Sequence, residues 1–275
     1  MKELIKGLRQ FKTSYFCRHQ ELFAQLAHGQ HPRVLFITCS DSRIDPNLLT
    51  QTQPGDLFVI RNAGNIIPPF GSANGGEGAA VEYAIQALNI EQVIVCGHSH
   101  CGAMKGLLKR DSLMGNMPLV YEWLGHAEAT RRLVQENYSN LEGEDLLDIT
   151  IAENVLTQIE NLRTYPVVRS RLYQGKLKIY AWIYDIDSGE VSAYDPELHA
   201  YMPPHTQLPT SEIDPEMLVP ITSCEINPGS PPSPKPAVAQ PAVAQPAVAR
   251  SDYGDSWLPP EQAERIYRGS ASTRR

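Results

Sequence analysis

The sequence has no apolar run long enough to cross a membrane and no long run of basic residues. None of its apolar runs approaches the roughly 18 residues that a membrane-spanning helix requires. The formal net charge of −7 argues against a nucleic acid as the partner. Residues 1–10 are charged and amphipathic, and they lack the apolar core of a signal peptide. We therefore expect a soluble, cytoplasmic protein.

Cysteine is scarce, and the few thiols present are Cys17, Cys39, Cys96, Cys101 and Cys224. An odd and sparse set in a cytoplasmic chain argues against a disulfide framework and favours free thiols and metal ligands. Cys96 lies within an apolar strand and Cys17 on a helix, so we expect both to be buried as small apolar side chains. Cys224 falls in a proline-rich segment and is expected to be an ordinary free thiol.

The apolar fraction of 42% is enough for one domain of about 200 residues with a sizeable core. After about Met202 the composition changes, and residues 203–249 are dense in proline and poor in large apolar side chains. A five-residue unit recurs there as PAVAQ, PAVAQ and PAVAR, which is too short for a solenoid repeat. Such a segment cannot bury enough surface to fold, so we expect a disordered, semi-extended linker.

Large apolar residues return beyond this linker. Residues 250–275 contain Trp257, Leu258, Ile266 and Tyr267, with arginines among them. An apolar patch at the end of a long tether is typical of a short docking peptide. The alternative is a frayed, disordered tail.

Over residues 1–202 short apolar runs alternate with longer amphipathic segments. The expected strands are 33–38, 57–60, 92–96, 177–186 and 190–194. The expected helices are 2–28, 77–88, 101–109, 117–137, 145–164 and 167–173. Strands separated by helices predict an α/β fold with a mainly parallel sheet flanked by helices. The tight turn at 187–189 adds an antiparallel hairpin at the edge of the sheet.

The helical segment 2–28 forms an N-terminal arm that we expect in one or two pieces. Its apolar residues recur at spacings of three and four. The resulting apolar face is larger than the arm itself can cover. Either a partner subunit or the chain's own domain must therefore pack against it.

Thiol and imidazole groups follow two of the expected strands. Cys39 comes directly after the first strand, and His98 and Cys101 follow the third. Because the carboxyl ends of parallel strands meet at one edge of the sheet, we expect these side chains to lie together. Three ligands of this kind suit a catalytic zinc ion with one open position.

Asp41 and Arg43 lie next to the first ligand. Asp41 can either bind zinc directly or accept a hydrogen bond from zinc-bound water, and a bidentate pair with Arg43 favours the second arrangement. Zinc lowers the pKa of bound water, so that zinc hydroxide is the expected nucleophile, oriented by Asp41 and Arg43. Two thiolates place more negative charge on the metal than three imidazoles would. The pKa of the bound water is then somewhat higher, so we expect activity to favour alkaline pH. The alternative is a structural zinc site with His100 or Cys96 as fourth ligand.

Cys39-x-Asp41-x-Arg43 together with His98-x-x-Cys101 resembles the zinc site of the β-class carbonic anhydrases. The similarity covers about residues 1–200 and includes three further motifs, RNAGN at 61–65, GAAVEY at 78–83 and GHSHCG at 97–102. It implies an α/β fold whose subunits pair as dimers, with the active site at the dimer interface. It implies reversible hydration of carbon dioxide to bicarbonate, with the Cys-His-Cys set on zinc and Asp41–Arg43 as the dyad.

The plant-type branch of that family lines its pocket with a Gln, a Phe and a Tyr. Gln30, Phe58 and Tyr83 match those positions, and Gly102 belongs to the same substrate-binding set. The resemblance implies that the Gln and the Tyr come from the partner subunit of a homodimer, which we expect to assemble further. Where the plant pocket has Val, this chain has Ala63, so the pocket volume differs there.

The proline-rich extension resembles that of the carboxysomal family members from cyanobacteria. The resemblance implies an enzyme enclosed in the carboxysome lumen, where it supplies carbon dioxide for carbon fixation in photosynthesis. We then expect residues 1–202 to be the catalytic domain, 203–249 the linker and 250–275 a peptide that docks on a carboxysome scaffold protein.

Two rival functions use the same residues. One is hydrolysis of carbon disulfide or carbonyl sulfide on the same fold, and the other is a scaffold protein with a merely structural zinc. The proton shuttle stays open among the remaining histidines, which are His19, His28, His31, His100, His126, His199 and His205.

Overall fold

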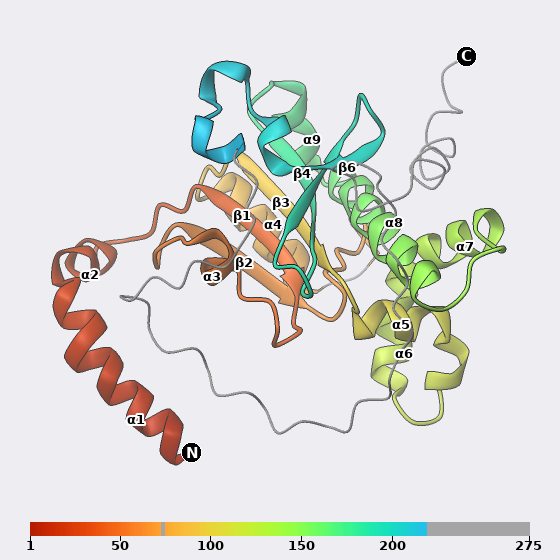
Figure 1. The fold of residues 1–275 in the computed structure, drawn as a ribbon, viewed down its shortest axis with the longest axis horizontal. Coiled ribbons are helices and arrows are strands. Elements are labelled where there is room, and N and C mark those ends of the chain that lie inside the picture. Colours follow the sequence, from red (N-terminus) through yellow and green to blue (C-terminus); the bar gives the residue numbers. More distant parts are fainter. Residues whose placement is uncertain (73–74, 219–275) are drawn as a thin grey trace.

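The computed structural model of the protein describes residues 1–72 and 75–218. A six-stranded sheet with the order β2-β1-β3-β4-β5-β6 lies at its centre (Figure 1). The strands are β1 Val34–Cys39, β2 Leu57–Asn62, β3 Gln92–His98, β4 Lys178–Tyr184, β5 Val191–Asp195 and β6 Ala200–Met202. Strands β1 to β4 are mutually parallel, whereas β5 and β6 are antiparallel to their neighbours. This confirms the predicted α/β fold with an antiparallel edge.

The helices connect and cover these strands. They are α1 Lys2–Gln10, α2 Gln20–Leu26, α3 Pro46–Thr50, α4 Gly76–Gln86, α5 Gly102–Leu108, α6 Pro118–Leu124, α7 Glu128–Asn137, α8 Gly143–Arg163 and α9 Pro166–Tyr173. Within the part of the chain that the structure describes, none of them combines the length and apolar character that a bilayer crossing requires.

The sheet buries side chains on both faces, as the alternation along each strand dictates. Leu35 and Ile37 of β1 join a large cluster formed mainly with α4, α5, α7, α8 and α9. Phe36, Ile94 and Cys96 point to the opposite face, where they form a smaller cluster with Trp182 and other aromatic residues. Cys96 is therefore buried in an apolar environment, as predicted.

The segment 117–137 is not one helix, contrary to the prediction. Helix α6 ends at Leu124, a 3-10 turn covers Gly125–Ala127, and α7 begins at Glu128. Arg110 supplies a reason, because its Nε donates to the Tyr121 carbonyl oxygen at 3.0 Å. That carbonyl would otherwise accept a helical hydrogen bond. The interruption depends on a contact distant in the sequence, which helical periodicity does not contain.

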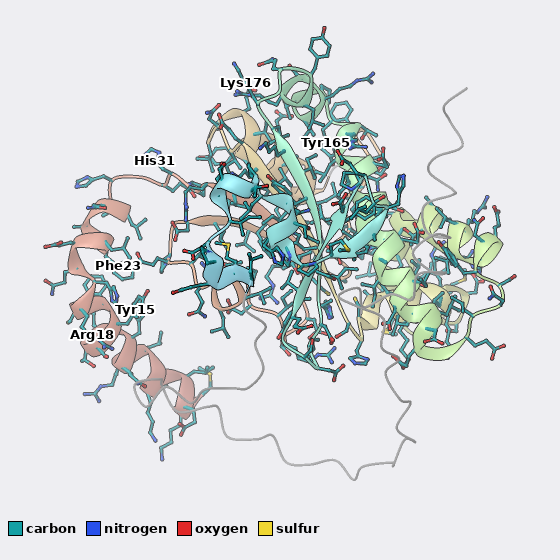
Figure 2. The ribbon with its side chains drawn as sticks, turned by 45° about the horizontal axis from the view of Figure 1, so that its top comes forward. Tyr15, Arg18, Phe23, His31, Tyr165 and Lys176 are labelled. Carbon is teal, nitrogen blue, oxygen red and sulfur yellow. The ribbon has the colours of Figure 1, made fainter. Side chains whose placement is uncertain are left out.

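The N-terminal arm consists of α1, a π-helical turn at Phe11–Phe16 and α2, so the expected two helical pieces are present. It extends away from the sheet, and no residue of these three elements is buried (Figures 1 and 2). Its aromatic rings pack mainly on one another, as Tyr15 and Phe23 do. Cys17 is exposed, so the prediction that it is buried is wrong. The arm has no core of its own in which to bury a thiol.

The described chain continues past the closing hairpin. The short strand β6 was not expected, because three residues are too few to show an alternating pattern. A 3-10 turn at Pro204–Gln207 then packs on the sheet, where Gln207 accepts a hydrogen bond from Trp182 and donates one to the Tyr194 carbonyl. Cys224, the rest of the expected linker and the expected docking peptide lie outside the described residues.

Candidate metal centre

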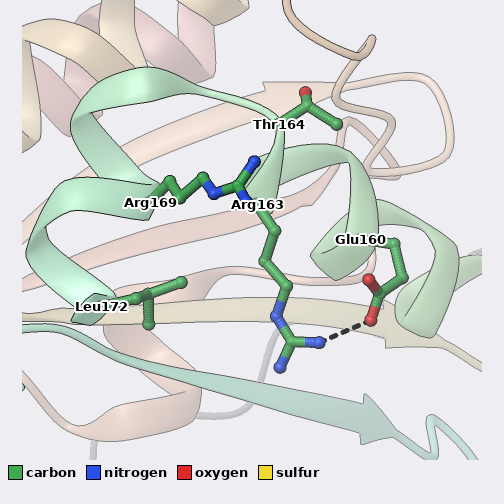
Figure 3. Close-up of a pocket in the computed structure, with 5 residues that line it drawn as sticks. All are labelled: Glu160, Arg163, Thr164, Arg169 and Leu172. Carbon is green, nitrogen blue, oxygen red and sulfur yellow. Dashed lines mark hydrogen bonds and ion pairs between the residues drawn. The ribbon is translucent and has the colours of Figure 1, made fainter.

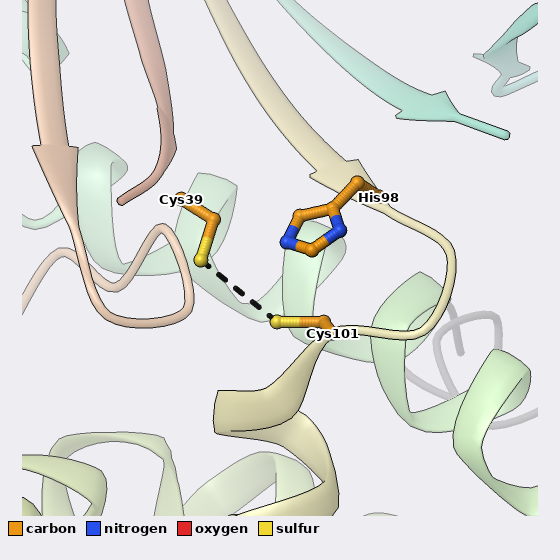
Figure 4. A group of neighbouring side chains, drawn as sticks. All are labelled: Cys39, His98 and Cys101. Atoms are coloured by element: carbon orange, nitrogen blue, oxygen red, sulfur yellow. Dashed lines mark hydrogen bonds between the residues drawn. The ribbon is translucent and has the colours of Figure 1, made fainter. Parts of the chain in front are cut away.

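The three residues predicted as metal ligands lie together at the carboxyl edge of the sheet (Figure 4). Cys39 ends β1, His98 ends β3, and Cys101 immediately precedes α5. All three side chains are buried, and their ligand atoms lie within 4.8 Å of one another. The Cys39 and Cys101 sulfurs are 4.0 Å apart. This spacing allows one ion to contact all three.

The loop between β3 and α5 brings Cys101 back toward His98. His100 adopts a left-handed backbone conformation with φ of 56°, which reverses the chain direction. The Ser99 backbone N–H donates to the Tyr184 carbonyl at 2.9 Å, and its hydroxyl accepts from the Ile186 N–H at 2.9 Å. The loop that presents the ligands is thus held by the end of β4.

The orientation of His98 leaves one ring nitrogen available. His98 Nδ1 lies 2.9 Å from the Ser99 carbonyl oxygen, which can only accept, so Nδ1 carries the proton. Nε2 is then a lone-pair acceptor, and this buried atom has no hydrogen-bond partner among the described residues. A buried, unsatisfied imidazole nitrogen beside two thiols fits a thiophilic metal ion such as zinc.

The two thiols influence each other's ionisation. A hydrogen bond from Cys101 lowers the pKa of Cys39, assisted by His98 and by the Gly64 N–H and opposed by burial. The hydrogen bond to Cys39 and burial in turn raise the pKa of Cys101. The pair gives up one proton readily and keeps the second until a cation compensates the added charge.

Asp41 and Arg43 form the bidentate pair that the sequence predicts. Arg43 Nε and Nη2 donate to the two carboxylate oxygens of Asp41 at 2.9 and 2.7 Å, and the Arg43 backbone N–H donates at 3.0 Å. These contacts hold the pKa of Asp41 well below its usual range, so the carboxylate is ionised. Its Oδ2 lies 3.9 Å from His98 Nε2, which places it beside the ligand atoms.

A family model for carbonic anhydrases matches residues 34–191, which is more than half of the chain. Among solved structures, the β-carbonic anhydrase CcaA aligns with a TM-score of 0.74 and 66% sequence identity, over 74% of this chain and 99% of that chain. The chain belongs to the β-carbonic anhydrase family. It is accordingly a carbonic anhydrase, an enzyme of reversible carbon dioxide hydration.

Two further matches show how much of the chain is similar to known carbonic anhydrases. A carbonic anhydrase of Synechococcus elongatus is 61% identical over 282 residues, which cover 99% of this chain and 100% of the relative. A chain from a study of two tetrameric β-carbonic anhydrases of the ascomycete Sordaria macrospora aligns with a TM-score of 0.64 and 27% identity, over 70% of this chain and 95% of that chain. The likeness to the Synechococcus enzyme thus extends beyond the catalytic fold into the C-terminal region.

Three of the residues predicted for the carbonic anhydrase substrate pocket lie far from the metal ligands of their own chain. Phe58 pairs with Leu35, four residues before Cys39 on β1. Four residues of strand span roughly 13 Å. Tyr83 packs beside Phe58 with ring centroids 6.1 Å apart. Gln30 precedes β1 and is exposed.

Gly102, in contrast, follows Cys101 directly as the first residue of α5. It is exposed, and a Cβ placed on it would meet no atom within 4 Å. The space beside Cys101 is therefore open to a small molecule.

Neither residue weighed as a fourth metal ligand joins the site. Cys96 lies in the cluster on the other face of the sheet. The His100 ring is bound to Asp187 at 2.6 Å and to Glu144 at 3.3 Å. The contacts of both residues favour a site with three protein ligands and one open position.

Some residues that hold the site were not assigned a role from sequence. Arg61 donates to the Cys39 carbonyl at 3.0 Å and to the Asp41 carbonyl at 2.7 Å. The Gly64 N–H donates to the Cys39 sulfur at 3.4 Å, and the His100 carbonyl accepts from Arg43 at 3.2 Å. The available signal was the polar stretch 61–65 at the end of β2, because β2 pairs with β1 and brings this stretch beside Cys39.

A separate shallow pocket lies between the end of α8 and α9 (Figure 3). It is lined by Glu160, Arg163, Thr164, Arg169 and Leu172. Arg163 is already paired with Glu160 at 2.6 Å. Glu160 lies sixteen residues along α8 from Glu144, or about 24 Å, so this pocket is remote from the metal ligands.

Proposed function

We propose that the metal of this carbonic anhydrase is zinc, held by Cys39, His98 and Cys101, with Asp41 and Arg43 as the catalytic dyad. The observation that carries the proposal is the buried His98 Nε2, which has no partner among the described residues and lies beside two buried thiols. Imidazole and thiolate ligands in this number suit catalytic zinc. Zinc bound there supplies Lewis acidity that makes hydroxide available near neutral pH.

Asp41 supplies orientation rather than proton transfer in this proposal. Its carboxylate is ionised and therefore accepts hydrogen bonds without donating any. It can accept the hydrogen bond of a water or hydroxide in the pocket and direct the oxygen lone pair toward carbon dioxide. Arg43 occupies both carboxylate oxygens, which favours a carboxylate that orients the nucleophile over one that closes the metal site.

The proposed substrate pocket requires a second copy of the chain. Gln30, Phe58 and Tyr83 lie at the strand ends opposite Cys39, so we infer that the partner subunit's copies face this site. The exposed apolar side chains of the arm, such as Leu4 and Leu8, supply surface for such a partner. The Sordaria relatives are tetramers, which supports further assembly of the dimers.

We further propose that the enzyme works in the carboxysome lumen, where it supplies carbon dioxide for carbon fixation. Residues 1–202 would be the catalytic domain, 203–249 the linker, whose first turn packs on the sheet, and 250–275 the peptide that binds a scaffold protein. The likeness to the Synechococcus enzyme over 99% of this chain supports an extension with a shared role. Apolar residues return after a long proline-rich segment, which supports a peptide that binds a partner at the end of a flexible tether.

Metal analysis combined with a carbon dioxide hydration assay tests the zinc proposal. The purified enzyme is expected to contain one zinc per chain. Cys39→Ser is expected to lose both the metal and the activity, because an alcohol is a poor ligand for zinc at neutral pH. Cys17→Ser, at an exposed thiol of the arm, is the matched control and is expected to retain both. Full activity in a zinc-free protein would refute the proposal.

Truncation tests the tail. Deleting 219–275 removes only residues that follow the described fold. The truncated enzyme is expected to keep its hydration rate and to lose co-sedimentation with carboxysomes, whereas the full chain keeps both. Loss of hydration with unchanged co-sedimentation would reverse the assignment.

A further inference from the structure

The backbone after β2 is held by a row of amide side chains on α8. Asn154, Gln158 and Asn161 follow one another at helical spacings of four and three, so they share one face of the helix. Asn154 Nδ2 donates to the Gly64 carbonyl at 2.9 Å. Gln158 Oε1 accepts from the Ile67 N–H at 2.9 Å, and Asn161 Nδ2 donates to the Ile67 carbonyl at 2.9 Å.

The same amides also bond to one another, which fixes their orientation. Gln158 Nε2 donates to Asn154 Oδ1 at 2.9 Å, and Asn161 Nδ2 lies 3.1 Å from Gln158 Oε1. Asn154 and Gln158 are completely buried or nearly so. Amides in such a position are costly to bury unless every group is bonded. Unlike apolar side chains, these amides fix the direction of the backbone groups that they bind, at Gly64 and Ile67.

A second contact fixes the peptide that joins Ala63 and Gly64. Trp123 Nε1 donates to the Ala63 carbonyl at 2.8 Å. The N–H of the same peptide belongs to Gly64, and in a trans peptide it points away from that carbonyl. This N–H donates to the Cys39 sulfur at 3.4 Å. Trp123 therefore determines the direction of the donor that reaches the metal ligand.

Any side chain in place of Gly64 would strain this peptide. Its φ of 83° lies in the left-handed region, and a Cβ there would approach Met104 Cε to 2.8 Å. Its N–H faces Cys39, its carbonyl faces Asn154, and the preceding carbonyl faces Trp123. Each polar backbone atom around Gly64 thus has one fixed partner.

We propose that Trp123 and Asn154 are positioning residues of the metal centre, which act through the Gly64 N–H hydrogen bond to Cys39. The inference rests on the proposed Cys39-His98-Cys101 metal site. Hydrogen bonds to a ligand sulfur orient it and reduce its donation of charge to the metal, and residues that supply such outer contacts control metal affinity. Neither side chain needs to touch the substrate.

Cobalt substitution of the full-length enzyme provides the test, because thiolate–cobalt(II) centres absorb by charge transfer from sulfur to metal. Trp123→Phe keeps an aromatic ring and removes only the indole N–H. We expect its charge-transfer band at lower energy than in the unsubstituted enzyme, since a thiolate that loses a hydrogen bond releases charge more easily. We also expect zinc affinity to fall about tenfold, because the sulfur is no longer held in the orientation that binds the ion.

Trp182→Phe is the matched control, because it also removes an indole N–H bond, to Gln207. Its band and zinc affinity are expected to stay unchanged. Asn154→Leu and Asn161→Leu form a second pair on α8. The first is expected to shift the band, and the second is expected to shift it less, because Asn161 binds Ile67 directly and reaches Gly64 only through Gln158 and Asn154.

An unchanged band in Trp123→Phe, with cobalt bound, would overturn the inference and leave the metal site intact. An equal shift in Trp182→Phe would overturn it too, because the effect would then be general. Should Asn154→Leu fail to fold, the tryptophan pair still decides. Failure of the unsubstituted enzyme to bind cobalt or zinc at all would refute the metal centre itself, and with it the inference.

Discussion

Asp41 combines two contacts at the half-buried rim of the candidate metal site. Arg43 binds both of its oxygens, yet one of them stays 3.9 Å from Nε2 of His98, a predicted metal ligand. A carboxylate bound directly to zinc would instead fill the coordination position that a catalytic site leaves open. The pair with Arg43 keeps Asp41 ionised and in place while leaving capacity for a solvent donor.

Replacement of Asp41 tests this role. Asp41→Asn is expected to keep the metal and to lower kcat by at least about a hundredfold, because an amide can present a donor where the reaction needs an acceptor. Metal content and stopped-flow carbon dioxide hydration measure the two effects separately. Glu160→Gln, which also breaks a carboxylate–arginine pair but near the remote pocket, is expected to match the unsubstituted enzyme. Equal turnover in Asp41→Asn would contradict the dyad.

At the scale of single residues, the sequence predicted which thiol and imidazole groups lie together better than it predicted the contacts that hold them in place. Cys39, His98 and Cys101 could be found because strand ends and short spacings place them together. The contacts of Arg61, Trp123 and Asn154 are made to backbone atoms far away in the sequence. Any residue type offers those backbone atoms, so no pattern in the sequence indicates which one is used.

At the scale of elements, strands β1 to β5 were predictable because each is a short apolar run with polar boundaries. The helix expected over 117–137 was not, because Arg110 interrupts it from another part of the chain. Strand β6 was missed because it is short, and its pairing with β5 depends on the preceding turn. Local periodicity thus predicts a helix or strand where nearby residues determine its ends, and fails where a distant contact does.

Helix α8 also contains a buried acid, Glu153, which lies against the Tyr138 hydroxyl at 2.9 Å. Burial raises the pKa of Glu153 to about 7 from an ordinary value of 4.5. The folded state therefore holds the proton more tightly than the unfolded state. The stabilising contribution is complete below about pH 4.5 and is lost as the pH rises through 7. A shift of this size corresponds to about 3 kcal/mol at most.

Glu153→Gln removes this ionisation. We expect the variant to gain unfolding free energy relative to the unsubstituted enzyme on going from pH 5 to pH 8, by about 1–3 kcal/mol. Urea unfolding of the metal-loaded proteins at both pH values provides the measurement. Glu136→Gln, at an exposed position on α7, is the control and is expected to show no such difference. If the difference in unfolding free energy between the variant and the unsubstituted enzyme is the same at both pH values, Glu153 does not titrate in this range.

At the scale of the whole molecule, the arm and the pocket residues argue for a site shared between two chains. This can be tested by mixing two variant chains, Cys39→Ser and Gln30→Ala, each of which is expected to be inactive on its own. In a mixed dimer of Cys39→Ser and Gln30→Ala chains, one site combines both lesions and the other combines neither, provided that Gln30 serves the partner's site. Each purified mixed dimer is therefore expected to regain one working site, measured by carbon dioxide hydration.

The control is a mixed dimer of Cys39→Ser and Cys101→Ser chains. Both lesions affect ligands that each chain supplies to its own site, so this dimer is expected to stay inactive. If the Cys39→Ser and Gln30→Ala dimer also stays inactive, while each variant still forms dimers, Gln30 does not act across the interface.

In the proposed dimer, the separation of Phe58 and Tyr83 from Cys39 makes catalysis depend on concentration. Activity per chain falls once the protein is diluted below the dissociation constant of the dimer, since a lone chain holds the metal ligands but lacks the facing pocket. Mass action then confines the enzyme's activity to places where many copies are crowded together. Newly made chains present at low concentration would remain monomeric and therefore inactive.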